Sequence, residues 1–124
     1  MDIPACIFCR LDRELLSESP LSLAFLDRFP VSKGHSLIAP RRHVATIWDM
    51  TNEEYHDAFQ LVYTVQTILR ERYSPDGFNV GVNSGEAAGQ SVWHAHIHVI
   101  PRYVGDVPNP RGGIRNVISG KGNY

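Results

Sequence analysis

Three histidines occupy alternate positions in the stretch SVWHAHIHVIPR, as His94, His96 and His98. Residues two apart on a β-strand point to the same face, with their side-chain origins roughly 6.6 Å apart. We therefore expect one strand to bring the three imidazoles into a shared site. Neighbouring imidazoles add nothing to the stability of a strand and repel once two are charged, so the pattern indicates chemistry. Two chemistries fit: a catalytic metal held by alternate histidines, or a metal-free site in which one imidazole attacks and its neighbours position and protonate.

The loop that precedes the histidines, SGEAAGQS, carries groups that suit phosphate binding. Gly85 and Gly89 give a permissive backbone, and Gln90 and Ser91 add amide and hydroxyl donors directly before the first histidine. Such a loop can surround phosphate oxygens with hydrogen-bond donors. Phosphate beside imidazole suggests a phosphoryl or nucleotidyl group carried on a histidine nitrogen.

Two cysteines, Cys6 and Cys9, form the motif CIFC and are the only cysteines of the chain. A secreted disulfide scaffold has more of them, so this pair is a redox motif, half of a metal site or two buried thiols. A structural zinc needs two further ligands. His43, in APRRHV, has no evident role in a helix or strand of its own.

The elements that position these residues predict an α+β domain. Short strands are expected at residues 21–27 and 35–40, joined by a reversal that contains Pro30 and Gly34. Thr51 and Glu54 match a capping box, and apolar residues recur behind them at three- and four-residue steps, which predicts one helix to about Tyr73. A further strand is expected at residues 78–83, before the glycine-containing loop and the histidine segment. A sheet with one long helix against it explains this order better than alternating βαβ units.

The segment after Pro101 is expected to be irregular. Its charge is uneven and suits a small anion, although a solvated, partly mobile end fits the composition equally well. The charged residues of this segment are Arg102, Asp106, Arg111, Arg115 and Lys121.

The bulk composition bounds the remaining possibilities. A chain of 124 residues with 43% apolar and 20% charged residues fits one globular domain. A net charge of −1 does not favour nucleic acid or an anionic membrane as a partner, and no apolar run is long enough to span a bilayer. The first residues lack the pattern of a secretion signal, so we expect a cytoplasmic protein.

The segment GQSVWHAHIHVIPR resembles the signature of the histidine triad family of nucleotide hydrolases and transferases. In that signature single hydrophobic residues separate three histidines, and two further hydrophobic residues follow the last histidine. The upstream segment FLDRFPVSKGHSLIAPRRHV is similar to the first sheet segment of that family. The resemblance implies an antiparallel sheet of about five strands with one long helix and a short one, and a homodimer that extends the sheet. It places this domain at residues 1–102, followed by an irregular basic tail at residues 103–124 that packs on or near the active site.

The resemblance also implies roles for individual residues. His96 would attack the α-phosphorus as a neutral imidazole whose other nitrogen keeps its proton against an acceptor such as a backbone carbonyl. His98 would contact the phosphate and help the leaving group to depart with a proton. The phosphate oxygens would be bound by Gly89, Gln90 and Ser91, the ribose by Asp27, with Asn83 nearby and His35 as a supporting hydrogen-bond partner. Ile7, Phe8, Phe25 and Leu26 would hold the base or belong to the core, and His56 would be a surface residue.

In this family a CxxC near the start accompanies histidines at the positions of His43 and His94, which implies a structural zinc bound by Cys6, Cys9, His43 and His94. A reversible disulfide and two inert thiols are the alternatives. The favoured function is hydrolysis of dinucleoside polyphosphates to AMP, with Mg²⁺ as a possible companion of the substrate. Adenosine 5'-phosphoramidase activity is the alternative within the family. A nucleotide-binding signalling or adaptor module, and a zinc hydrolase that uses all three triad histidines as ligands, are the alternatives from other classes.

Overall fold

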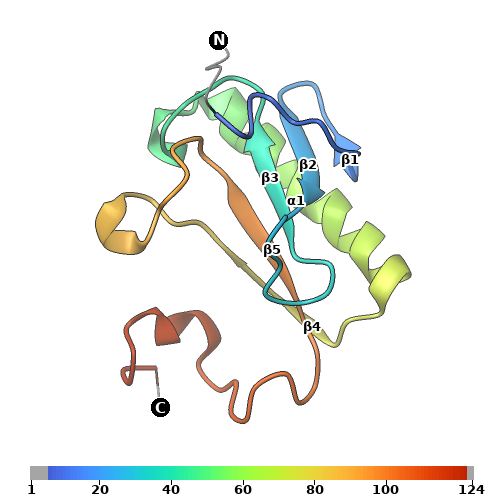
Figure 1. Cartoon of the computed structure of the whole chain (residues 1–124), viewed down its shortest axis with the longest axis vertical. Coiled ribbons are helices and arrows are strands. Elements are labelled where there is room, and N and C mark those ends of the chain that lie inside the picture. Colours follow the sequence, from blue (N-terminus) through green and yellow to red (C-terminus); the bar gives the residue numbers. More distant parts are fainter. Residues whose placement is uncertain (1–5, 123–124) are drawn as a thin grey trace.

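The computed structural model describes residues 6–122, which form a five-stranded antiparallel sheet with one long helix (Figure 1). The strand order is β1-β2-β3-β5-β4, and every neighbouring pair is antiparallel. The strands are β1 (Ser17–Glu18), β2 (Ser22–Leu26), β3 (Ser36–Pro40), β4 (Gly77–Gly81) and β5 (Ile97–Arg102). The predicted α+β class and the antiparallel sheet with one long helix are therefore confirmed. In place of one short helix, the described residues form three 3-10 turns: η1 (Ile47–Asp49), η2 (Glu86–Ala88) and η3 (Gly113–Val117).

Helix α1 (Asn52–Tyr73) begins where the capping box predicts. The Thr51 side chain accepts a hydrogen bond from the Glu54 N–H at 3.1 Å, and the Glu54 carboxylate accepts one from the Thr51 N–H at 2.8 Å. The guanidinium of Arg42 donates to both carboxylate oxygens of Glu54, at 2.7 and 2.9 Å. These contacts lower the pKa of Glu54 to about 2, so its carboxylate stays charged and continues to hold the start of the helix.

The main core lies between α1 and one face of the sheet, and Figure 1 shows the helix crossing behind β2 and β3. Alternate residues of the strands point to the helix, as the period of a half-buried sheet requires. This core contains the buried residues Ala24, Ile38, Ile97 and Val99 from strands and Ala58, Leu61, Val65 and Leu69 from α1.

The opposite face of the sheet positions the functional residues. Phe8, Phe25, Leu37 and Ala39 form a second buried cluster. The strand register pairs Phe25 with Leu37, Leu37 with His98, and His98 with Gly81. These four residues therefore make one continuous row across β2, β3, β5 and β4, and His98 lies in the middle of the face that α1 does not cover.

The expectation that one strand holds all three histidines is wrong. Strand β5 begins at Ile97, so only His98 lies within it. The Ala95 N–H donates to the Val44 carbonyl at 2.7 Å, outside the sheet, and so the chain is held away from strand pairing before Ile97. The strands expected at residues 21–27, 35–40 and 78–83 exist, with their ends shifted by one or two residues.

The C-terminal segment has little regular structure, as its composition predicts. It is anchored at its start by Arg102, whose guanidinium donates to both Asp106 carboxylate oxygens at 2.7 and 2.8 Å. Turn η3 then packs against β4, at the end of the sheet farthest from β1 (Figure 1). In the part of the chain that the structure describes, no helix is long and apolar enough to cross a membrane.

Candidate active site

His96 is held as the tautomer with a proton on Nδ1. Its Nδ1 lies 2.8 Å from the backbone oxygen of His94, and a carbonyl can only accept, so Nδ1 must donate. The lone pair of the neutral ring is then on Nε2. The ring is 8% exposed, and its edge contacts Phe8, with ring centres 5.1 Å apart. The arrangement leaves one nitrogen of a positioned imidazole able to act as a nucleophile.

His98 receives its tautomer from His35. The Val31 N–H donates to His35 Nδ1 at 3.1 Å, so the proton of the neutral His35 ring is on Nε2. That nitrogen lies 2.9 Å from His98 Nδ1 and donates to it, which leaves the proton of His98 on Nε2. Asp27 Oδ2 lies 3.5 Å from His35 Nε2. His35, which sequence reasoning placed as a supporting partner, is thus in direct contact with the triad.

Burial keeps both of these rings neutral near pH 7. It is the largest cause that lowers the pKa of His98 to about 4, followed by the neighbouring His96 and His35 rings. Burial also lowers the pKa of His35, against the opposing effect of the Asp27 carboxylate. A neutral His98 can donate through Nε2 to a phosphate oxygen without a positive charge beside His96.

The Gln90 side chain braces the loop before the triad. Its Oε1 accepts from the Gly85 N–H at 2.9 Å, and its Nε2 donates to the carbonyls of Ala45 and Val92 at 2.7 and 3.0 Å. Both amide protons are therefore engaged, and the Gln90 backbone N–H donates to the Gly85 carbonyl at 3.1 Å, so Gln90 shapes the loop and does not present a free donor to a ligand. The nearby Ser91 is exposed at the cavity and has no hydrogen bond among the described residues.

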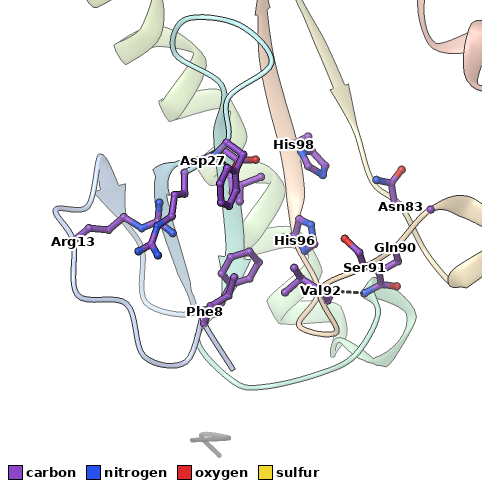
Figure 2. Close-up of a pocket in the computed structure, with 14 residues that line it drawn as sticks. Phe8, Arg13, Asp27, Asn83, Gln90, Ser91, Val92, His96 and His98 are labelled. Atoms are coloured by element: carbon purple, nitrogen blue, oxygen red, sulfur yellow. Dashed lines mark hydrogen bonds between the residues drawn. The ribbon is translucent and has the colours of Figure 1, made fainter. Parts of the chain in front are cut away.

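A cavity of about 480 Å³ opens over the two catalytic candidates. In Figure 2, Arg13, Asp27 and Phe8 lie on one side of His96 and His98, and Asn83, Gln90 and Ser91 lie on the other. Ile7 and Phe8 line the cavity, as predicted for a base pocket, whereas Phe25 is fully buried and Leu26 does not line it. All of the predicted substrate-binding residues except His35 line it: Asp27, Asn83, Gly89, Gln90, Ser91 and His98.

Five lining residues were missed by sequence reasoning: Arg13, Arg28, Phe29, Leu37 and Val92. The Arg13 guanidinium lies 5.1 Å from the centre of the Phe25 ring and donates to the Leu26 carbonyl at 2.7 Å. Nothing in the local sequence LDRELL marks this arginine, because the contacts that place it come from the packing of β2.

A second cluster unites Cys6, Cys9, His43 and His94, whose potential ligand atoms all lie within 4.8 Å of one another. Cys6 Sγ and Cys9 Sγ are 3.3 and 3.5 Å from His94 Nδ1, and Cys9 Sγ is 3.3 Å from His43 Nδ1. Ligand atoms around a tetrahedral zinc are about 3.3–3.8 Å apart, given Zn–S of 2.3 Å and Zn–N of 2.0–2.1 Å. His94 Nε2 donates to the Pro40 carbonyl at 2.7 Å, which leaves the Nδ1 lone pair for a metal. The donor set therefore fits a structural zinc, and the two cysteines are not joined by a disulfide.

Comparison with known proteins agrees with this geometry. The sequence profile of the HIT domain family matches residues 10–105. The chain belongs to the HIT (histidine triad) family.

The HIT relatives include proteins with named activities. The chain is 39% identical over 103 residues to protein hit of Bacillus subtilis, which covers 79% of this chain and 71% of that protein. It is 37% identical over 115 residues to an adenosine 5'-monophosphoramidase of Schizosaccharomyces pombe, with 89% and 80% covered. It is also 37% identical over 93 residues to an asymmetrical bis(5'-nucleosyl)-tetraphosphatase of the same organism, with 75% and 51% covered. The HIT chain described here is a nucleotide hydrolase.

One solved HIT structure bears on the metal cluster. It is a zinc-bound histidine triad family protein from Mycobacterium smegmatis, which is 31% identical and superimposes with a TM-score of 0.77 over 86% of this chain and 81% of that chain. The zinc belongs to that protein.

Proposed function

We propose that this HIT hydrolase cleaves dinucleoside polyphosphates at the α-phosphate through His96. The single observation that carries the proposal is the hydrogen bond of His96 Nδ1 to the His94 carbonyl, because it fixes the lone pair on Nε2 in the cavity next to His98. A ring that was free to exchange tautomers would carry its proton on Nε2 for part of the time, and during that time Nε2 could not attack.

The reaction proceeds in two displacements. His96 Nε2 attacks the α-phosphorus, a P–N bond forms, and the bond from phosphorus to the bridging oxygen breaks, releasing a polyphosphate nucleotide whose oxygen keeps the electron pair. Water then attacks the same phosphorus and gives up a proton to solvent, the P–N bond breaks, AMP leaves and the Nε2 lone pair returns. The His98 Nε2–H and the Ser91 hydroxyl and backbone N–H donate to phosphate oxygens as charge is redistributed, while Gln90, whose backbone N–H bonds to the Gly85 carbonyl, keeps the loop in shape. Asp27 accepts from ribose hydroxyls.

Adenosine phosphoramidase activity is the second candidate. It is favoured by the long match to the monophosphoramidase of Schizosaccharomyces pombe. In that reaction the leaving amine needs a proton that a polyphosphate does not. A signalling or adaptor module gains no support, because the triad is complete. A zinc hydrolase also lacks support, since no cluster of potential metal ligands within residues 6–122 contains His94, His96 and His98 together.

Three further expectations belong to this proposal. A zinc bound by the Cys6, Cys9, His43 and His94 cluster would have four protein ligands and no open position, and would serve structure alone. Mg²⁺ would accompany the polyphosphate, and two domains would pair into a dimer. Metal analysis of the purified protein, turnover with and without Mg²⁺, and light scattering test these three in turn.

The deciding experiment traps the intermediate. Rapid acid-free quenching of the protein with a dinucleoside tetraphosphate, followed by peptide mass spectrometry, is expected to find AMP on the peptide that contains His96. The His96→Ala variant should show no adduct, and an adduct elsewhere or none in the wild type would refute the proposal. Product analysis with an adenosine phosphoramidate in parallel separates the two substrate classes.

A further inference from the structure

A second cavity lies on the other side of His98 from the one described above. It has a volume of about 330 Å³ and lies over β4 and β5. Its floor contains Gly81 and Ile100, and turn η3 of the C-terminal segment provides Ile114 and Val117. Ligand pockets in proteins commonly have volumes of about 300–1,000 Å³, so this cavity is large enough to receive a ligand group.

The two cavities meet at the reaction centre. His98 and Asn83 line both of them. The Asn83 side chain is exposed and makes no hydrogen bond among the described residues, so its amide is available at the junction. A ligand that extends from the first cavity into the second must pass His98.

The sheet register explains why the cavities lie in line. Leu37 on β3 lines the first cavity, His98 on β5 lines both, and Gly81 on β4 lines the second. These residues are cross-strand partners, so the row from Leu37 to Gly81 spans about 10 Å, two strand spacings. The substrate-binding trough thus runs across the strands of the uncovered sheet face.

Glycine at position 81 keeps the second cavity open. A Cβ built at this position meets only the Ile114 Cδ1 atom, at 3.6 Å, which is ordinary contact. A larger side chain here would fill the space between the β4 floor and turn η3. The apolar walls and the adjacent amide match the flat, partly apolar surface of a nucleoside with polar edges.

We propose that this cavity binds the leaving half of the substrate, the nucleoside at the far end of a dinucleoside polyphosphate. The inference rests on the proposed function and adds a second subsite to it. The first cavity holds the nucleotide that is transferred to His96, the phosphate chain passes His98 and Asn83, and the leaving nucleoside lies between β4 and turn η3. A substrate with a small leaving group, such as a simple adenosine phosphoramidate, would use the first cavity alone.

The test compares two substrates in Gly81→Val. The backbone at Gly81 is not in the left-handed region, so valine is compatible with the strand. We expect the ratio of kcat/KM for diadenosine tetraphosphate to kcat/KM for adenosine phosphoramidate to fall about 10-fold, mainly through KM for the tetraphosphate. Gly77→Val is the matched control, because a Cβ at the other end of β4 meets nothing within 4 Å, and its ratio should equal that of the wild type.

Two further readouts keep the test decisive. Ile114→Ser removes a wall from turn η3 and leaves the strand intact, so it should lower the same ratio if Gly81→Val folds poorly. In the His96→Ala background, calorimetry should show that Gly81→Val weakens binding of diadenosine tetraphosphate more than binding of AMP. An unchanged ratio in both variants would overturn the subsite. Failure of the wild type to cleave the tetraphosphate would instead refute the proposed function, and the calorimetry would still test the subsite.

Discussion

His94 and His96 stand two residues apart, yet they belong to two regions with different chemistry. In the cysteine–histidine cluster, His94 donates through Nε2 to the Pro40 carbonyl and presents Nδ1 to the thiols. In the catalytic cavity, His96 donates through Nδ1 to the His94 carbonyl and presents Nε2. Each ring is fixed by one backbone carbonyl, and the nitrogen that this carbonyl occupies decides which lone pair is available. Residue type thus supplies an imidazole, whereas the backbone acceptor decides which nitrogen is left free for the role proposed here, metal binding for His94 and nucleophilic attack for His96.

The largest effect is expected from His96→Ala. Removal of the nucleophile should lower kcat by at least about 10³-fold, because the remaining groups only bind and polarise the phosphate. Steady-state kinetics measures the loss, and thermal unfolding in the same preparation should show a smaller drop in Tm than His94→Ala does. A variant that keeps more than a tenth of the wild-type kcat would mean that another group attacks.

His94→Ala should instead act mainly on metal binding and stability. Loss of one ligand should abolish stoichiometric zinc and lower the free energy of unfolding by about 3 kcal/mol, since metal loss is among the largest single-residue effects. Urea denaturation and metal analysis measure these changes, and Cys6→Ser should reproduce both. Normal stability and activity without bound zinc in the wild type would show that the cluster has no structural metal.

The sequence predicted the elements better than the contacts between them. The capping box and helical period located α1, and the alternating histidines located the active-site segment, because both signals are local. The strand start at Ile97 was missed because the Ala95 N–H bonds to Val44, 51 positions away, and no local pattern reveals that contact.

The site divides in the same way. The residues of the triad and the phosphate loop were predictable as types, and the family resemblance named most of the cavity lining. The tautomers of His94 and His35 were not predictable, because the Pro40 carbonyl that orients His94 and the Val31 N–H that orients His35 come from the packing of other segments. Arg13 was missed for a similar reason, and the bracing role of Gln90 depends on the Ala45 carbonyl, 45 positions away.

An intermediate effect is expected at His35, which sets the tautomer of His98. His35→Ala should lower kcat about 10- to 100-fold, because His98 Nδ1 loses its donor and the ring can present either nitrogen to the phosphate. His35→Gln offers a carbonyl to the Val31 N–H and an amide proton to His98 Nδ1, and it should recover part of the rate. Equal kcat values for His35→Ala and His35→Gln would show that His35 does not act through its hydrogen bond to His98.

The smallest effect concerns pH and stability. The pKa of His98 is lowered to about 4 by burial, while that of an unfolded histidine is about 6.5. As the pH falls from 6.5 to about 4, the unfolded chain takes up a proton at this position that the folded chain refuses, so the free energy of unfolding must decrease across that window and level off below it. His35, whose pKa is also lowered, acts in the same direction. As the pH is lowered, urea midpoints should therefore fall less steeply for His98→Gln than for the wild type. Parallel curves would show that the pKa of His98 is the same in the folded and the unfolded chain.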